Sequence, residues 1–310
     1  MKKVFIDGSA GTTGLRIIER LENRQDIELI RLTEENRKDI NARREALNQA
    51  DIAFLCLPDA AAIEAVSLID NENTVVIDTS TAHRVDTSWA YGFPELSADY
   101  EEKIKSSKRI ANPGCHASGF IALIFPLVEK GILPKDVLLS ATSITGYSGG
   151  GKKMIAEYED FELDSLLTAP RQYGISQKHK HLPEMKAVTG IENEPLFLPI
   201  VSNFYSGMEV TIPLFASQLN KGFTVADIKN AYKDKYNGPV VKYVEEFDEN
   251  GFVSANKLEL MDSMEVSVSG NDDRILLIAR YDNLGKGASG AAVECMNIVL
   301  GVEKTTGLEI

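Results

Sequence analysis

The sequence of 310 residues predicts an α/β protein with two domains, a doubly wound parallel sheet followed by an α+β domain. Three observations lead to this prediction. A buried strand at residues 3–6 runs directly into a glycine-rich turn and a helix, and further strand–helix units follow up to about residue 115. Longer strands with alternating polarity begin after about residue 132.

The turn at residues 7–14, DGSAGTTG, has glycines spaced G-x-x-G-x-x-G between the first strand and the first helix. Glycines in such a turn let the backbone approach a pyrophosphate, which the helix N-terminus then binds. The spacing therefore predicts a Rossmann-like dinucleotide site. Its candidate cofactor-binding residues are Gly8, Gly11, Thr12, Thr13 and Gly14. The helix that follows is expected to bury Leu15, Ile18 and Leu21.

The second strand, residues 27–32, ends without the acidic residue that binds the ribose 2′-hydroxyl of NAD. Arg31 lies there instead, and Arg37 and Lys38 follow it. Because basic side chains bind a 2′-phosphate, the sequence favours NADP(H) over NAD as the cofactor. Arg43 and Arg44 are interpreted as a solvated face of the next helix.

The ends of the later strands are candidate ligand-binding positions, because open α/β sheets bind ligands beyond the carboxyl ends of their strands. Residues 57–58 end the third strand and are expected to border the cofactor. Residues 80–84 end the fourth strand, which makes Arg84 a candidate substrate contact, and Asn112 is another at the end of the fifth. His83 is interpreted as a loop histidine, since no nearby residue in the sequence orients it.

Cys115 follows a Pro-Gly step in the stretch ANPGCHASG, residues 111–119, and precedes an apolar helical run that Pro126 is expected to bend or interrupt. In the first turn of a helix, unpaired N–H groups and the positive end of the dipole stabilise a thiolate. Cys115 is therefore the candidate nucleophile for acyl transfer. Cys56 and Cys295 lie inside apolar segments and are interpreted as core cysteines.

The second domain is expected to contain a mixed or antiparallel sheet, with strands at 137–146, 208–216, 264–270 and 275–281. The first of these strands leads into GYSGGGKK at residues 146–153. Backbone amides, a hydroxyl and a lysine bind phosphate-like oxyanions, so Ser148, Gly149 and Lys152 are candidate phosphate ligands. A flexible loop is the alternative interpretation.

The segment QKHKHLPEM at residues 177–185 contains two histidines and a carboxylate. No third cluster of ligands accompanies them, so a metal site is not predicted. Acid–base catalysis fits better, because a helix beginning near Pro183 would let Glu184 orient the imidazole of His181 three residues earlier. Either His181 or His179 is the candidate acid–base group, with Glu184 as its supporting residue.

The last segment predicts a helix at residues 291–300 that ends before Gly301. The apolar face of this helix needs a partner, and the N-terminal sheet is the simplest one, with Asn283 then near the amide of the cofactor. The predicted NADP-binding domain is therefore discontinuous and comprises residues 1–115 and 285–310. The catalytic and oligomerisation domain comprises residues 116–284.

The formal net charge of −13 argues against nucleic acid or an anionic membrane as the partner, because both require a basic face. Three cysteines at irregular spacing give neither a disulfide framework nor a Cys-x-x-Cys metal pair. No segment has the length of a membrane span or the pattern of a signal peptide. A cytoplasmic protein that acts on a small molecule is expected.

Five motifs in this order, GSAGTTG, ANPGC, GYSGGGK, HKHLPE and NLGKGASG, resemble the N-acetyl-gamma-glutamyl-phosphate reductase family in its shorter form. The resemblance covers the whole chain. It implies a Rossmann domain joined to a glyceraldehyde-3-phosphate-dehydrogenase-like catalytic domain, NADPH-dependent reduction in arginine biosynthesis, and a homo-oligomer, with a tetramer favoured. It also implies that Cys115 is the nucleophile and that the HKH segment supplies the acid–base histidine. Residues 80–84, STAHR, depart from the Ser-Ala-Asp-Phe-Arg-like run of longer relatives, which leaves the role of this loop open.

The residue types then predict a reaction. The thiolate of Cys115 attacks the acyl phosphate, phosphate departs towards residues 148–152, NADPH delivers a hydride to the thioester, and His181 or His179 handles the proton of the thiohemiacetal. A backbone N–H near Cys115 is expected to stabilise the tetrahedral oxyanion. Two alternatives stay open at this point: another acyl-phosphate reductase such as aspartate-semialdehyde dehydrogenase, and a nucleotide-sensing regulator without turnover.

Overall fold

The computed structural model describes all 310 residues and divides into two compact units. Unit 1 comprises Met1–Gly114 with Ala288–Leu308, and unit 2 comprises Cys115–Gly287 with Glu309–Ile310. The boundaries predicted from the sequence differ slightly, because they assign Cys115 and residues 285–287 and 309–310 to the first domain. The carbonyl of Cys115 accepts a hydrogen bond from Tyr281, which explains why its contacts lie in unit 2.

Unit 1 contains a six-stranded sheet in the order β2-β1-β3-β4-β6-β5, in which every pairing is parallel. The chain runs from β1 to β2 on one side and then continues on the other side at β3, so the topological switch lies between β1 and β3. The predicted parallel sheet is confirmed. Its strands are β1 Lys2–Asp7, β2 Ile27–Ile30, β3 Ile52–Leu55, β4 Val75–Asp78, β5 Ala90–Tyr91 and β6 Arg109–Ala111.

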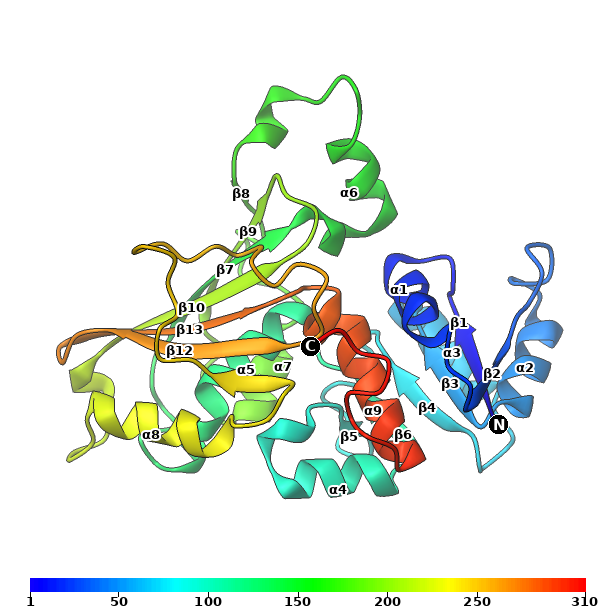
Figure 1. Cartoon of the computed structure of the whole chain (residues 1–310), viewed down its shortest axis with the longest axis horizontal. Helices are drawn as coiled ribbons and strands as arrows, with labels where there is room; N and C mark the ends of the chain where they lie inside the picture. Colours follow the sequence, from blue (N-terminus) through cyan, green and yellow to red (C-terminus); the bar gives the residue numbers. More distant parts are fainter. The chain divides into compact units, whose positions relative to one another are not determined.

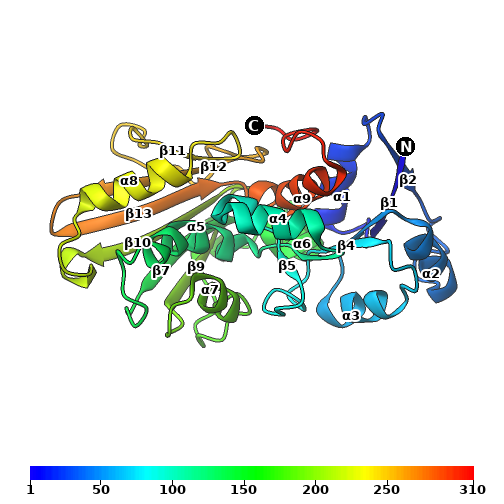
Figure 2. The same ribbon diagram turned by 90° about the horizontal axis from the view of Figure 1, so that it is seen from below.

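Helices cover both faces of this sheet. One apolar cluster joins the strands to α1 (Thr12–Leu21), α4 (Ala98–Ser106) and α9 (Gly290–Leu300), and a second joins them to α2 (Ile40–Gln49) and α3 (Asp59–Ser67). Figure 2 shows α1 and α9 on one side of the strands and α3 on the other. In α1 the buried side chains are Ile17 and Leu21, whereas Leu15 is 43% exposed, so the predicted face of this helix was wrong by part of a turn.

Unit 2 contains a seven-stranded mixed sheet in the order β11-β12-β13-β10-β7-β9-β8. The central pairs are antiparallel, while β7–β9 and β11–β12 are parallel, which confirms the mixed sheet. The sequence interpretation missed β9, because Pro199 lies in the middle of it. The strands are β7 Ser140–Gly146, β8 Arg171–Gln172, β9 Leu196–Ser202, β10 Met208–Phe215, β11 Val241–Tyr243, β12 Met264–Gly270 and β13 Arg274–Tyr281.

Three helices of unit 2 lie on the same side of its sheet (Figures 1 and 2). Helices α5 (Cys115–Glu129) and α8 (Val225–Lys235) pack on the strands, and α7 (Leu182–Thr189) packs against α5. Helix α6 (Gly151–Tyr158) instead belongs to an arm between β7 and β8 that rises from one end of the sheet (Figure 1). The arm has its own small core around Tyr147 and Tyr158.

Helix α5 continues through Pro126, contrary to the expected interruption. Proline lacks the N–H that would bond to the carbonyl four residues earlier, which is that of Ala122. The hydroxyl of Tyr236 donates to this carbonyl at 2.7 Å, and Tyr232 donates to the next one, that of Leu123, at 2.5 Å. Tertiary hydrogen bonds thus replace the missing helical one. None of the helices combines the length and apolar character that a membrane span requires.

Candidate active site

Cys115 is the first residue of α5 and is half-buried, which confirms the predicted start of a helix at this thiol. The first turn contains no acidic residue, so no charge there opposes an anion at the helix N-terminus. The backbone of Gly287 lies against Cys115, and a Cβ at this glycine would lie 3.1 Å from that of Cys115. The thiol is therefore held at a helix N-terminus where a thiolate is favoured.

A buried hydroxyl group fixes the first turn of α5. Tyr281, whose side chain is fully buried on β13, donates to the carbonyl of Cys115 at 2.5 Å and accepts from the N–H of Gly119 at 3.0 Å. A Cβ at Gly119 would lie 2.7 Å from this hydroxyl, so only glycine leaves room for it. The sequence interpretation missed Tyr281, because it is 166 residues away from Cys115 in the chain.

The predicted histidines, His179 and His181, lie beside His116, the residue that follows Cys115 in the sequence. The ring centroids of His179 and His181 are 4.7 Å apart, and those of His116 lie 5.5 Å and 5.6 Å from them. Burial lowers the pKa of His179 to about 4, so its imidazole is neutral at pH 7. Unit 2 therefore gathers three of the four histidines of the chain within one cluster next to Cys115.

His181 and Glu184 both belong to the start of α7. His181 is the N-cap residue, and the helix begins at Leu182, which confirms the helix predicted near Pro183. His181 is 4% exposed and Glu184 is 1% exposed. Burial, and then the charges of Cys115 and Glu184, raise the pKa of Tyr281, so the thiol and the carboxylate act on the same hydroxyl. No group of three or more histidine, cysteine or acidic side chains is arranged to hold a metal ion.

His116 and Tyr173 are functional candidates that the sequence interpretation missed. His116 was assigned only to the apolar helical run, yet its ring is 3% exposed and makes two side-chain hydrogen bonds. Its Nδ1 lies 2.7 Å from the hydroxyl of Ser143, and its Nε2 lies 2.6 Å from that of Tyr173. The only signal in the sequence was the position of His116 directly after the candidate nucleophile.

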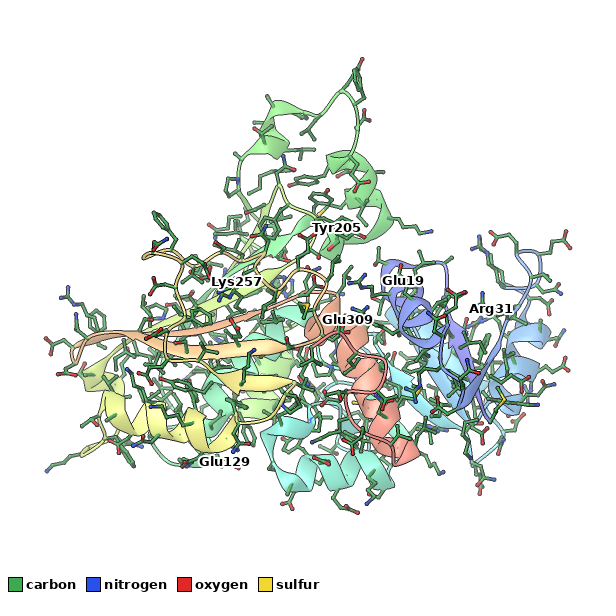
Figure 3. The ribbon with its side chains drawn as sticks, viewed as in Figure 1. Glu19, Arg31, Glu129, Tyr205, Lys257 and Glu309 are labelled. Atoms are coloured by element: carbon green, nitrogen blue, oxygen red, sulfur yellow. The ribbon has the colours of Figure 1, made fainter.

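Two hydrogen bonds to residues outside the GYSGGGKK loop hold its Ser148. Ser148 is fully buried, and its N–H donates to the carbonyl of Tyr205, which Figure 3 labels near the arm. The Ser148 hydroxyl accepts a hydrogen bond from the side-chain amide of Asn283 at 3.0 Å. The Asn283 carbonyl oxygen in turn accepts from the N–H of Gly207 at 2.9 Å. Gly149 and Lys152 are exposed, so they, and not Ser148, face solvent.

The loop at residues 80–84 lies in unit 1 and carries two of the predicted residues. Arg84 donates to the carbonyls of Asn112 at 2.9 Å and of Thr79 at 2.8 Å. Asn112 is fully buried, and its side-chain amide donates to the carbonyl of Ala288 at 2.9 Å. Arg84 and Asn112 therefore join the ends of β4 and β6 to the start of the segment that leads into α9.

The expectation that His83 has no orienting neighbour was wrong. Its Nδ1 lies 2.6 Å from a carboxylate oxygen of Asp78, which is fully buried at the end of β4. The ring also stacks on Trp89 with a centroid separation of 4.0 Å. The turn after β4 folds back over the end of the strand and brings His83 to Asp78. The two residues are five apart in the sequence, which matches neither helical nor strand periodicity, so the sequence did not predict this contact.

A cavity of about 510 Å³ lies at the carboxyl ends of β1, β2 and β3, next to the glycine-rich turn. Gly8 has φ +86°, and a Cβ there would lie 2.2 Å from the carbonyl oxygen of Cys56. Gly11 is the N-cap residue of α1, so no side chain caps the N–H groups of Thr12, Thr13 and Gly14, and the first turn lacks acidic residues. These observations fit a bound pyrophosphate. Leu57 and Pro58, which were expected to border the cofactor, also line the cavity.

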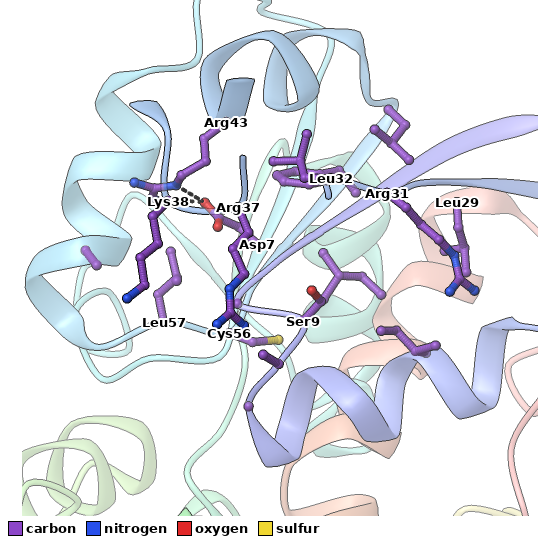
Figure 4. A pocket seen from close by; sticks show the side chains of 18 of the residues that line it. Asp7, Ser9, Leu29, Arg31, Leu32, Arg37, Lys38, Arg43, Cys56 and Leu57 are labelled. Atoms are coloured by element: carbon purple, nitrogen blue, oxygen red, sulfur yellow. Dashed lines mark hydrogen bonds and ion pairs between the residues drawn. The ribbon is translucent and has the colours of Figure 1, made fainter. Parts of the chain in front are cut away.

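Four basic side chains line this cavity in different ways (Figure 4). Arg37 and Lys38 reach into one side of it, whereas Arg31 extends towards Leu29 and bonds to Glu22 at 3.3 Å. Arg43 is 8% exposed and pairs with the buried Asp7 at 3.0 Å and with Glu64 at 2.8 Å. The interpretation of Arg43 as a solvated residue was therefore wrong, while Arg44 is indeed on the surface, paired with Asp70.

Two family descriptions match the chain. "Semialdehyde dehydrogenase, NAD binding domain" matches residues 3–106, and "Semialdehyde dehydrogenase, dimerisation domain" matches residues 115–283. Two curated relatives, from Sinorhizobium medicae and Brucella ovis, are named N-acetyl-gamma-glutamyl-phosphate reductase. Each is 44% identical to this chain, and the alignments cover 96% of this chain and 98% and 99% of the two relatives. The chain belongs to the N-acetyl-gamma-glutamyl-phosphate reductase family, within the semialdehyde dehydrogenases. The resemblance inferred from the five motifs is thereby confirmed.

Solved structures with a similar fold are aspartate semialdehyde dehydrogenases. The enzyme from Francisella tularensis has a TM-score of 0.73 at 14% identity, covering 97% of this chain and 100% of that one. The Candida albicans enzyme, solved with NADP, has a TM-score of 0.66 at 15% identity and covers 99% of both chains. These likenesses confirm the fold class of the family. The NAD-binding domain confirms a nicotinamide cofactor for this chain, and the dimerisation domain supports an oligomer.

Proposed function

We propose that this protein is an NADP-dependent oxidoreductase that reduces N-acetyl-gamma-glutamyl phosphate to N-acetyl-glutamate 5-semialdehyde and phosphate, a step of arginine biosynthesis. The observation that carries the proposal is the half-buried thiol of Cys115 at the N-terminus of α5, beside a cluster of three histidines. A thiolate is the nucleophile that acyl transfer requires, and the names of the curated relatives support this substrate. Unit 1 is then the cofactor-binding domain and unit 2 the catalytic and oligomerisation domain.

The thiolate of Cys115 attacks the acyl carbon, the C–O bond to phosphate breaks, and inorganic phosphate departs from the thioester that forms. NADPH, when bound to the cavity of unit 1, supplies the hydride that reduces this thioester. His181 donates a proton to the oxygen of the reduced acyl group, which gives the thiohemiacetal. It then takes this proton back, the C–S bond breaks, and the aldehyde leaves while Cys115 returns to the thiolate. Glu184 supports His181 by its place in the first turn of the same helix. His179 remains the competing acid–base group.

The exposed part of the GYSGGGKK loop supports a role in phosphate release. Gly149 and Lys152 offer a backbone amide and an ammonium group to solvent at the start of α6. Ser148 and Asn283 support this role indirectly, because their hydrogen bond fixes the loop, and Arg84 with Asn112 fixes the segment before Cys115 in the same way. We assign these four residues to positioning the site.

The cofactor proposal gives a test of specificity. Replacing Arg37 and Lys38 together with alanine is expected to raise the KM for NADPH at least about 100-fold, because each charge-assisted hydrogen bond to the 2′-phosphate contributes roughly 1.5–3 kcal/mol. The KM for NADH is expected to stay the same, since NADH lacks this phosphate. Arg44→Ala is the matched control, because Arg44 is on the surface outside the cavity. An equal rise for both cofactors would contradict the assignment.

Assays in the oxidative direction decide the substrate. With NADP and phosphate, the protein is expected to oxidise N-acetyl-glutamate 5-semialdehyde and to leave aspartate semialdehyde unchanged. Preference for aspartate semialdehyde would favour the other reductase, and binding of NADP without turnover of either would favour a nucleotide-sensing regulator. We further propose a homotetramer, which the dimerisation domain supports only as far as an oligomer. A cytoplasmic location stays a prediction, consistent with three free cysteines.

A further inference from the structure

A chain of three side chains connects the sheet of unit 2 to the surroundings of Cys115. It begins at Ser143 on β7, continues through His116 on α5 and ends at Tyr173, directly after β8. The two contacts measure 2.7 Å from the Ser143 hydroxyl to Nδ1 of His116 and 2.6 Å from Nε2 to the Tyr173 hydroxyl. Ser143 is fully buried and His116 nearly so, while Tyr173 is half-buried. The reaction proposed above does not use this chain of residues.

The imidazole of His116 is neutral. Burial, and then the charge that His179 gains at low pH and the charge of Lys180, lower the pKa of His116 to about 3. A neutral imidazole has one N–H donor and one acceptor nitrogen. One of its two hydrogen bonds therefore donates from the ring and the other accepts.

The buried hydroxyl of Ser143 decides which nitrogen carries the proton. His116 is the one hydrogen-bond partner of this hydroxyl, so the Ser143 proton is satisfied only by donation to Nδ1. The proton of the ring is then on Nε2 and is donated to the oxygen of Tyr173. The Tyr173 hydroxyl makes no other hydrogen bond within the protein, so its own proton is directed at a ligand.

Tyr173 lies close enough to Cys115 to meet a ligand that this thiol carries. Burial raises the pKa of the Tyr173 hydroxyl, and a negative charge on Cys115 raises it further. The ring of Tyr173 is 6.1 Å from that of His179. Tyr173 is therefore a neutral hydrogen-bond donor among the groups that surround the thiol.

We propose that Tyr173 donates a hydrogen bond to the oxygen of the acyl group that Cys115 carries, and that Ser143 and His116 hold the Tyr173 hydroxyl in the donating orientation. Tyr173 is thus a further catalytic residue, and His116 and Ser143 are positioning residues. Tyr173 keeps its proton throughout and stabilises the negative charge that develops on this oxygen when the acyl carbon becomes tetrahedral. This inference rests on the proposed function, because it requires an acyl group on Cys115.

Tyr173→Phe tests the donor, because it removes the hydroxyl alone. We expect kcat with N-acetyl-glutamate 5-semialdehyde, NADP and phosphate to fall about 10²-fold, while the KM for the semialdehyde changes less than about threefold. A higher KM with unchanged kcat would overturn the inference, since Tyr173 would then bind another part of the substrate. If the wild-type protein does not oxidise this semialdehyde, the proposed function itself fails, so the two failures are distinguishable.

Two substitutions of His116 test the positioning. His116→Gln places an amide donor near the position of Nε2, where it still reaches Tyr173, whereas the shorter His116→Asn reaches only the side of Ser143. We expect His116→Gln to keep kcat within about fivefold of wild type and His116→Asn to lose about as much as Tyr173→Phe. The double variant His116→Asn, Tyr173→Phe is expected to lose no more than either. Equal losses for the Gln and Asn variants, at equal thermal stability, would show that His116 only fills space.

The tautomer provides a measurement that does not depend on turnover. Imidazole ¹⁵N shifts of the wild-type protein, assigned through His116→Gln among only four histidines, are expected to show His116 with its proton on Nε2 at neutral pH. Ser143→Ala is expected to remove this preference and to lower kcat. A proton on Nδ1 in the wild-type protein would reverse the hydrogen bonds and contradict the inference.

Discussion

Replacing Cys115 with serine is expected to lower phosphate-dependent oxidation of N-acetyl-glutamate 5-semialdehyde by at least about 10³-fold. The serine hydroxyl keeps the size of the side chain, but it does not ionise at the N-terminus of α5 as a thiol does. NADP binding should be unchanged, because the glycine-rich turn and its cavity belong to unit 1. Steady-state rates and NADP titration of the same preparation measure both quantities.

Cys295→Ala is the matched control for this substitution. Cys295 is fully buried in an apolar cluster of unit 1, so its loss affects packing and leaves the acyl-transfer chemistry intact. Cys56 is unsuitable because it lines the cavity, and burial raises the pKa of its thiol to about 12, so it is also unreactive. Rapid alkylation of the wild-type protein should abolish activity, and substrate should prevent it. Full activity of Cys115→Ser would refute the assignment of the nucleophile.

Replacing His181 with asparagine is expected to lower kcat about 10²–10⁴-fold, because this substitution removes the group that transfers the thiohemiacetal proton. Asparagine is a favourable N-cap residue, so α7 should keep its first turn. His179→Asn is the comparison and is expected to have a smaller effect. A larger loss from His179→Asn than from His181→Asn would exchange the two roles.

The pH dependence of kcat tests the role of His179. Burial lowers the pKa of His179 to about 4, so this imidazole gains a proton only as the pH falls towards that value. Between about pH 5.5 and 8 its charge does not change, and a change of rate in that range belongs to another group. We therefore expect wild type and His179→Asn to show the same pH dependence of kcat in this range. A change of rate in this range that is present in wild type and absent from His179→Asn would contradict this.

The elements that depend on local pattern were predictable. The alternation of apolar runs and glycine turns predicted the parallel sheet of unit 1, and the Pro-Gly step before an apolar run predicted that α5 begins at Cys115. Periodicity was less reliable in α1, where apolar residues lie on more than one face of the helix, and Ile17 is buried instead of Leu15. Proline misled twice, since β9 accommodates Pro199 and α5 continues past Pro126.

Some of the site was outside the reach of the sequence. Arg43 looks like a surface residue in its helix, but the buried carboxylate of Asp7 draws it inside. Ser148 looks like a phosphate ligand, but Asn283 binds it from a segment 135 residues away. In each case the partner lies on another element, and its distance along the chain carries no periodic signal.

By itself, the sequence determined the two-domain α/β class, the turn at Gly8, the thiol at Cys115 and the histidine pair, because these depend on backbone conformations and short-range spacing. Only the tertiary structure decided that Tyr281 fixes the first turn of α5 and that Ser143, His116 and Tyr173 form one hydrogen-bonded chain. Such contacts arise from the register of β7 and β13 and the packing of α5 against the sheet. The direction of each hydrogen bond depends on which buried group has to donate its proton. This is defined only after the fold has brought the partners together.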